Sequence, residues 1–126
     1  IGTDSNDLVV KTGTGGNTEQ LRITDDGRGL SQFTAKAWCS YHDTTINGSH
    51  NISSMTDVEL GVSYANFSNN MANTDYAVIG MAFSSNCNQH GPYIAGVETN
   101  RVKLLSLLQT NCNYNDITTH FAIFGD

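Results

Sequence analysis

The sequence has little charge, almost no proline and no long apolar run, and each absence narrows the class of protein. Charged residues make up 14% of the 126 positions, against about 25% in ordinary soluble domains. The six Lys and Arg are scattered singly under a net charge of −6, whereas proteins that hold phosphate backbones carry a basic patch. The longest apolar stretch, 104–108, is strand-sized and far below the roughly 20 residues that span a bilayer. We therefore expect neither nucleic acid as a partner nor membrane insertion.

Signatures of catalysis and of metal binding are also missing. No Gly-x-Ser-x-Gly turn is present to display a nucleophilic serine. The paired acids, Asp25 with Asp26 and Asp57 with Glu59, fall at turns, where Asp is favoured because it hydrogen-bonds the backbone. No two of the four histidines are spaced as ligands of one metal ion. A metal site would then need a threefold axis that brings together one His120 from each of three chains. The sequence predicts no enzyme, no metal and no cofactor.

The cysteine count is low and odd. Cys39, Cys87 and Cys112 form no Cys-x-x-Cys pair, so a structural zinc site is poorly supported. Small secreted scaffolds usually carry four or more cysteines. We expect three free thiols, and if one pair forms, Cys87 with Cys112 is the best candidate.

Over the whole chain, Asn, Thr, Ser and Gly take the place of the missing charge. Residues 1–32 form a low-complexity segment. Short strands are expected at Leu8–Lys11 and Gln20–Thr24, and Asp25-Asp26-Gly27 is a turn signal. Strands this short bury too little apolar surface to order alone. We therefore expect this segment to be a β stalk that is ordered only in a homotrimer, with four side chains packing against symmetry mates: Leu8, Val10, Leu21 and Ile23.

From Phe33 the pattern becomes that of a half-buried strand. Phe33, Ala35, Ala37, Cys39 and Tyr41 share one face by strict alternation, and that face is the natural core face. Trp38 is the exception, because it is a large aromatic side chain on the polar face. It needs cover from a neighbouring element or from another subunit.

More strands follow at the spacing typical of sandwiches and barrels. The nearly continuous apolar run of Tyr76–Phe83 predicts cover on both faces, and Pro92 is expected in a turn. No window holds a helical stripe. We predict an all-β protein, with a short β stalk in residues 1–32 and an antiparallel β-sandwich-type head in residues 33–126. Four aromatic residues are expected in the head core or at subunit contacts: Phe33, Trp38, Tyr64 and Phe83. The other expected strands are Ile46–Ser53, Val58–Phe67, Tyr93–Glu98, Arg101–Leu108 and Thr118–Phe124.

Several blocks resemble a known family. Gly15–Arg28 resembles the stalk-type repeat of bacteriophage tail fibres, and Phe33–Trp38 resembles the opening strand of a module at the C-terminal ends of such fibres. Later blocks of that module are matched by Asn51–Asp57, by Val62–Phe67 with Met71, and by Tyr76–Gly80. The likeness covers about residues 15–83, and the family usually has Val where Cys39 stands. The resemblance implies a homotrimeric fibre tip, located on the virion outside the host cell, that attaches a virus to a bacterial surface.

Two polar, Asn-rich loops are the candidate receptor-binding site. They span 84–93 and 109–116, each joins apolar strands, and each contains one Tyr. Sugars are recognised by aromatic faces and uncharged hydrogen-bonding groups, and loops on a rigid scaffold are the usual place for recognition. The partner predicted for them is a bacterial surface glycan or an outer-membrane protein. The alternatives are plain hairpin loops on a tip that only drives trimer registration, or an enzyme that degrades surface polysaccharide. The candidate residues are Asn86, Asn88, Gln89, His90, Tyr93, Asn111, Asn113 and Tyr114.

Overall fold

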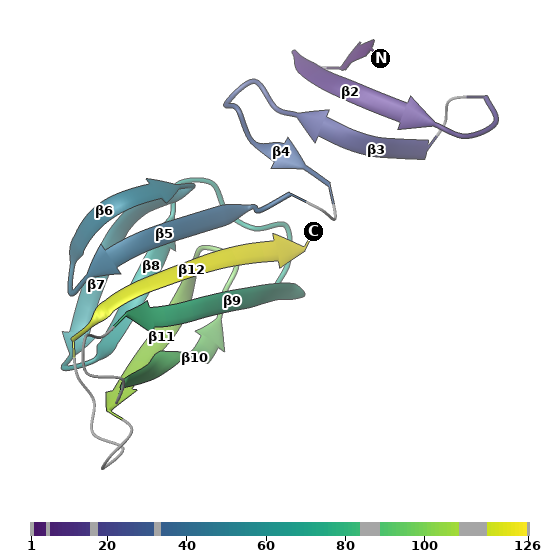
Figure 1. Cartoon of the computed structure of the whole chain (residues 1–126). Helices are drawn as coiled ribbons and strands as arrows, with labels where there is room; N and C mark the ends of the chain where they lie inside the picture. The colour runs from purple at the N-terminus through teal and green to yellow at the C-terminus, as the bar shows by residue number, and fades with distance from the viewer. Residues whose placement is uncertain are drawn as a thin grey trace.

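The protein is all-β in a computed structural model that describes residues 2–4, 6–15, 18–31, 34–83, 89–108 and 116–125. The described residues form twelve strands in three antiparallel four-stranded sheets. One sheet is built from the N-terminal residues, and the other two stack as a sandwich (Figure 1). The predicted all-β class and the sandwich-type head agree with this architecture.

The N-terminal sheet follows chain order, with β1 (Gly2–Asp4), β2 (Asp7–Thr12), β3 (Thr18–Ile23) and β4 (Gly29–Leu30) as neighbours. Leu8 pairs with Ile23 and Val10 with Leu21, so these four side chains share one face, because directly opposed residues point to the same side of a sheet. Leu8 is 41% exposed and Ile23 is 40% exposed. The N-terminal sheet therefore presents an apolar row to solvent in the single chain.

The sandwich consists of two sheets, each of which combines strands consecutive in the chain with strands distant in sequence. One sheet has the order β6-β5-β12-β9 and the other the order β10-β11-β8-β7. Side chains from both sheets join one buried apolar cluster, so the core lies between them. The strands are β5 (Ala37–His42), β6 (Thr45–His50), β7 (Ile52–Glu59), β8 (Val62–Phe67), β9 (Tyr76–Phe83), β10 (Gln89–Val97), β11 (Arg101–Leu108) and β12 (Thr118–Gly125).

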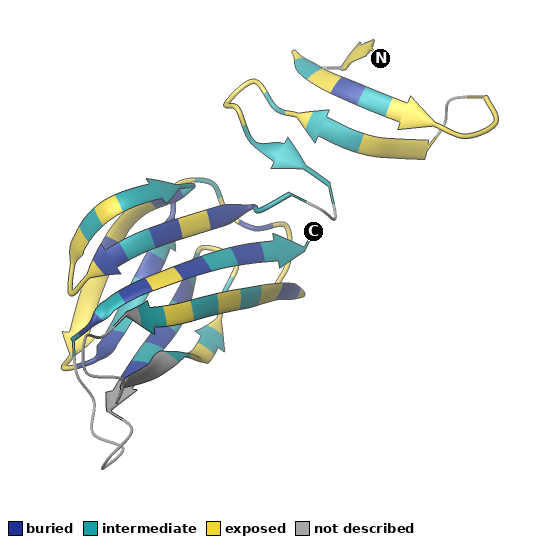
Figure 2. Cartoon of the chain, viewed as in Figure 1, coloured by how far each residue is buried: buried dark blue, intermediate teal, exposed yellow. Residues whose placement is uncertain are grey.

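The core face of β5 is the one that the alternation predicts. Ala37, Cys39 and Tyr41 are buried, while Trp38 and His42, which point to the other face, are exposed. Figure 2 shows the same alternation along β5 and β12. The Tyr41 ring meets Phe121 of β12 edge-on, with ring centroids 6.2 Å apart. Its hydroxyl lies 3.3 Å from the Ser63 hydroxyl of the other sheet, so one side chain contributes both packing and an inter-sheet hydrogen bond.

Two predicted strands are wrong because the chain reverses inside them. The predicted strand Ile46–Ser53 is interrupted at Asn51, which has a φ of 56° and donates side-chain hydrogen bonds to the carbonyl oxygens of Lys36 and Asn69 at 3.1 and 3.0 Å. The predicted strand Val58–Phe67 is interrupted at Gly61, which has a φ of 69°. Asn and Gly are the residues that tolerate this left-handed conformation best.

Pro92 lies inside β10, whereas the sequence predicted a turn there. The pairing of β10 with β11 shifts between His90 and Tyr93, so Pro92 occupies an irregular position where its missing N–H does not break a regular ladder. The predicted strand at Tyr93–Glu98 is therefore only the second half of β10, which begins at Gln89.

The prediction that Tyr76–Phe83 is covered on both faces is wrong within the single chain. Ile79 is 63% exposed and Met81 is 73% exposed, both on the side of β9 that faces away from the core. Trp38 is 44% exposed and Tyr64 is half-buried, so neither lies in the core, and subunit contact remains the untested part of that prediction. Phe33 and the side chain of Phe83 lie outside the described part of the chain.

Gly80 is expected to tolerate no side chain. A Cβ built there would lie 2.5 Å from Pro92 Cγ and 2.8 Å from the backbone oxygen of His120, and neither neighbour is the flexible end of a side chain. We expect Gly80→Ala to lower the free energy of unfolding by about 1–3 kcal/mol through overpacking. Urea denaturation measures this loss, and Gly96→Ala is the matched control because its nearest contact is an ordinary 3.7 Å to Lys103 Cβ. Equal stability of the two variants would contradict the close approach of β9 and β10.

Candidate functional site

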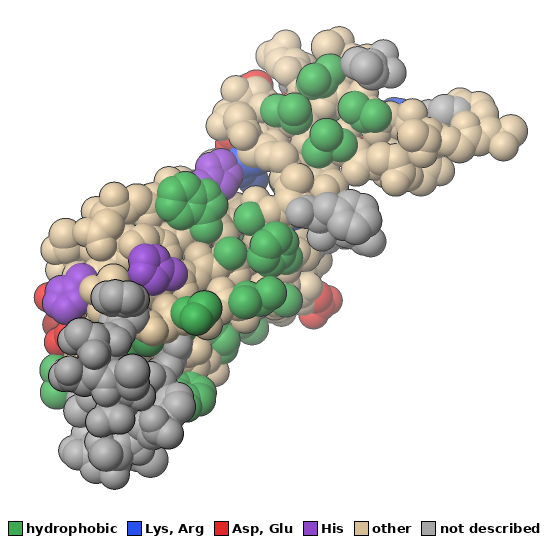
Figure 3. All heavy atoms as spheres, viewed as in Figure 1, with side chains coloured by type: hydrophobic (Ala, Val, Ile, Leu, Met, Phe, Trp, Pro, Cys, Tyr) green, Lys and Arg blue, Asp and Glu red, His purple; other side chains and the backbone are tan. Residues whose placement is uncertain are grey.

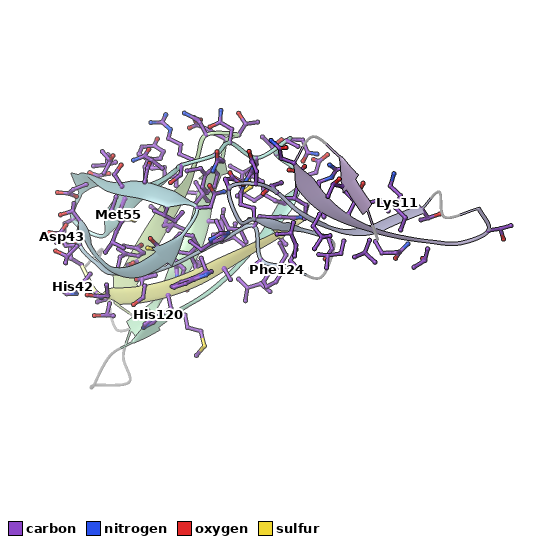
Figure 4. The ribbon with its side chains drawn as sticks, turned by 90° about the horizontal axis from the view of Figure 1, so that it is seen from above. Lys11, His42, Asp43, Met55, His120 and Phe124 are labelled. Atoms are coloured by element: carbon purple, nitrogen blue, oxygen red, sulfur yellow. The ribbon has the colours of Figure 1, made fainter. Side chains whose placement is uncertain are left out.

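Strand pairing gives the sandwich two distinct ends. At one end Ala37 pairs with Ile123 and Tyr76 with Gly125, and the chain enters this end from the N-terminal sheet. At the other end, here called the distal end, Phe83 pairs with Thr118 and Gln89 with Leu108. Figure 4 shows Lys11 of the N-terminal sheet and Asp43 of the β5–β6 turn at opposite ends of the molecule.

The roots of both predicted recognition loops lie at the distal end. Phe83 precedes the first predicted loop and Leu108 precedes the second. The prediction of a loop over 84–93 is wrong in its second half, because Gln89–Tyr93 belongs to β10. Asp116 is the last residue of the second predicted loop. Tyr93 is 47% exposed on β10. Gln89 and His90 pair through their backbones with Leu108 and Leu107. The side chains of Gln89 and His90 lie outside the described part of the structure. So do the other five predicted site residues: Asn86, Asn88, Asn111, Asn113 and Tyr114.

A backbone clamp ties the second loop root to the β7–β8 turn. The Gly61 N–H donates to the Asp116 carboxylate at 2.8 Å, and the Ser106 N–H donates to the Gly61 carbonyl at 2.8 Å. Hydrogen bonds to a charged acceptor are stronger than neutral ones. Ser106 before the second loop and Asp116 at its end are thus held against the same turn. This connection could not be predicted from the sequence, because Gly61 and Asp116 are 55 positions apart.

Acidic side chains line a small hollow at this end. Its walls include Asp43, Asp57 and Asp116, and its volume of about 10 Å³ is too small for an organic ligand. Tyr41 also lines the hollow, and burial raises the pKa of this phenol, so it stays protonated and can hydrogen-bond Ser63. Within the described ranges, no three His, Cys, Asp or Glu side chains group closely enough to hold a metal ion.

The outer face of the β10-β11-β8-β7 sheet carries an aromatic and cationic row that the sequence reasoning missed. The Arg101 guanidinium carbon lies 4.0 Å from the Tyr64 ring centroid, and the Lys103 ammonium lies 5.8 Å from it. Tyr93 pairs with Leu105, two residues along β11 from Lys103, so it shares this face. Alternation along Arg101–Leu108 was the available signal, because it places Arg101, Lys103 and Leu105 on one side.

Comparisons of the chain with protein-family models, with curated proteins and with solved structures find no match. None of the described residues belongs to a helix that is long and apolar enough to cross a bilayer.

Proposed function

We propose that this chain is the receptor-binding tip of a bacteriophage tail fibre, that it works as a homotrimer, and that it attaches the virion to a bacterial surface glycan or outer-membrane protein. The observation that carries the proposal is the placement of the loop roots. Both Asn-rich loops leave the sandwich at the distal end, and the N-terminal sheet joins the opposite end. A rigid scaffold with a support at one end and polar loops at the other is the arrangement that an attachment protein needs.

The trimer in this proposal is supported by the N-terminal sheet. Val9 is its one fully buried apolar side chain among the described residues, and the apolar row of Leu8, Val10, Leu21 and Ile23 has no second sheet over it. A single sheet of short strands gains too little from burial to offset the entropy of ordering it. Further copies of the chain would supply the missing cover. The resemblance to trimeric fibre tips indicates that the assembly has three copies.

A trimer also explains how modest loop contacts would hold a virus to a cell. Each loop is presented three times at one end, so the second and third contacts form at high effective concentration. The loops need no charge for this purpose, since uncharged amides and tyrosines recognise sugars by hydrogen bonding and stacking. Attachment, unlike degradation, requires no pair of carboxylates across a cleft.

The test is cell binding by the full chain. Fluorescently labelled protein is titrated against a panel of bacterial strains, including strains with truncated lipopolysaccharide or without single outer-membrane proteins, and bound label is measured by flow cytometry. We expect saturable binding to a subset of strains, lost when one surface component is removed. The double variant Asn86→Ser/Asn113→Ser should weaken binding at least about tenfold, a loss of about 1.4 kcal/mol.

The matched control is Asn70→Ser, the same chemical change at an exposed position in the segment between β8 and β9, at the opposite end of the sandwich. It should leave binding unchanged. Equal weakening by the two sets of substitutions would remove the loops as the site. If the chain forms a trimer but binds no strain, the result favours a tip that only aligns the three chains. Release of reducing ends from host polysaccharide would favour an enzyme.

A further inference from the structure

The outer face of the β6-β5-β12-β9 sheet is apolar and uncovered in the single chain. Trp38 pairs with Ala122, and Ala122 pairs with Ile79 on its other side, so the three side chains form a row across three strands. In the next row, Met81 and His120 lie side by side. Figure 4 shows His120 and Phe124 on the side of β12 that faces away from the other sheet.

This face has the shape and the aromatic anchor of a protein–protein contact. An open depression of about 480 Å³ runs over it, lined by Trp38, Ile79, Met81 and His120 among others. The Trp38 ring lies over Gly48, where an added Cβ would meet the indole at an ordinary van der Waals distance of 3.5 Å. Large flat aromatic and Met side chains are enriched at interface cores, where charged residues are depleted.

The same face carries no charge. The described strand positions that point outward from this sheet include no Asp, Glu, Lys or Arg, although the chain holds 12 acidic residues. The outward polar groups are hydroxyls and imidazoles, such as Ser40, His42 and His120. Copies of an acidic protein repel one another across most of their surface, so an acid-free face is where two copies approach at the least electrostatic cost.

The N-terminal sheet carries a second apolar patch on the same side of the molecule (Figure 3). Figure 3 shows hydrophobic side chains gathered over that sheet and over the β5-β12-β9 surface on the same side of the molecule. On the N-terminal sheet the exposed members are Leu8 and Ile23. A receptor held at the distal end would leave the N-terminal part of this surface bare, whereas a parallel copy of the chain covers both parts in one contact.

We infer that copies of this chain pack against one another through this side, which consists of the outer face of the β6-β5-β12-β9 sheet and the Leu8-Val10-Leu21-Ile23 row, around an axis along the molecule. This inference rests on the homotrimer of the proposed function and names its contact surface. Parallel packing about a closed axis directs all three pairs of loops to the same end. The opposite outer face, which carries Tyr64 and Arg101, stays outside.

Trp38 tests the inference directly, because it is the single tryptophan of the chain and lies in the middle of the assigned surface. The protein is measured by light scattering for mass and by acrylamide quenching of tryptophan fluorescence. We expect a mass three times the 13.6 kDa of the chain and a Trp38 that is protected from acrylamide. On dilution to the monomer, quenching should rise severalfold, since the indole is 44% exposed in the single chain.

The matched variants are Ile79→Glu and Leu60→Glu, which place the same charge at positions that are 63% and 57% exposed. We expect Ile79→Glu to be monomeric with an exposed Trp38 and an unchanged far-UV circular dichroism spectrum, and Leu60→Glu to stay trimeric. A trimer in which Trp38 remains open to acrylamide overturns the assigned surface and leaves the attachment function standing. A wild-type chain that is monomeric at every concentration overturns the trimer itself.

Discussion

Replacing Phe121 by alanine is expected to lower the free energy of unfolding by about 3–5 kcal/mol, the range for removing a buried aromatic side chain. Phe121 is 4% exposed in the middle of β12, and its ring packs edge-on against Tyr41. Its backbone neighbours, Cys39 and Gly80, have small side chains or none, and Gly80 cannot be enlarged to fill the space. The cavity therefore stays largely open, and the loss falls at the upper end of the range.

Urea denaturation at a fixed protein concentration measures this effect, because the stability of an oligomer depends on concentration. Phe124→Ala is the control, since it removes the same side chain three positions along β12 where Phe124 is only half-buried on the outer face. We expect its effect on the monomer to be less than half as large. The comparison is made in the Ile79→Glu background, so that loss of a subunit contact at Phe124 does not enter. Equal losses would mean that Phe121 is not a core residue.

Raising the pH through the range from 9 to 11 is expected to destabilise the fold through Cys39. This thiol is 2% exposed in the core, and burial raises its pKa from 9.0 to about 11, because the thiolate is poorly solvated there. The unfolded chain loses the thiol proton first as the pH rises. The stabilising contribution is therefore complete below pH 9 and falls by about 2 kcal/mol by pH 11.

The measurement is the free energy of unfolding at each pH for the chain with Cys87→Ser and Cys112→Ser, with and without Cys39→Val. Valine keeps the site apolar and cannot ionise. Burial also raises the pKa of Tyr41 and of Tyr76, so both chains lose stability at the upper end of the range, and the difference between them isolates Cys39. Parallel pH profiles would show that the thiol is hydrated in the native state. Slow labelling of Cys39 by a thiol reagent at pH 8 is the companion result.

Period-two patterns identified strands well wherever one continuous apolar run coincided with one strand. Arg101–Leu108 and Tyr76–Phe83 have the predicted bounds, and the last strand differs by one residue. The same pattern failed at Asn51 and Gly61, because alternation records which face a side chain takes and does not record a reversal of direction. At Gly61 the apolar alternation of Val58, Leu60, Val62 and Tyr64 continues across the turn.

The second limit of prediction from the sequence was whether an apolar strand face is buried within the single chain. The apolar run at Tyr76–Phe83 indicated cover on both sides, yet Ile79 and Met81 are exposed in the single chain. The pattern reports that a side chain favours burial, and the partner that buries it lies outside the sequence of the strand. In the inferred trimer that partner is another copy, which would reconcile the run with the exposure.

The candidate site was likewise predicted from the sequence only in part. Composition alone singled out both Asn-rich loops, because uncharged polar residues between apolar strands are typical of exposed connections. Whether their side chains bind a receptor stays a prediction. The aromatic and cationic row around Tyr64 was missed, since its members come from two strands that the sequence separates by more than thirty positions.

By itself the sequence determined the β class, the inward face of β5 and the hairpin at Asp25-Asp26-Gly27, because each depends on residues within a few positions of one another. Only the tertiary structure decided that β12 lies between β5 and β9 and that Asp116 is tied to Gly61. Those pairings join strands far apart in the chain, and their choice depends on how two whole sheets share one core. The meeting of both loop roots at one end and the bare apolar face on one side follow from that choice.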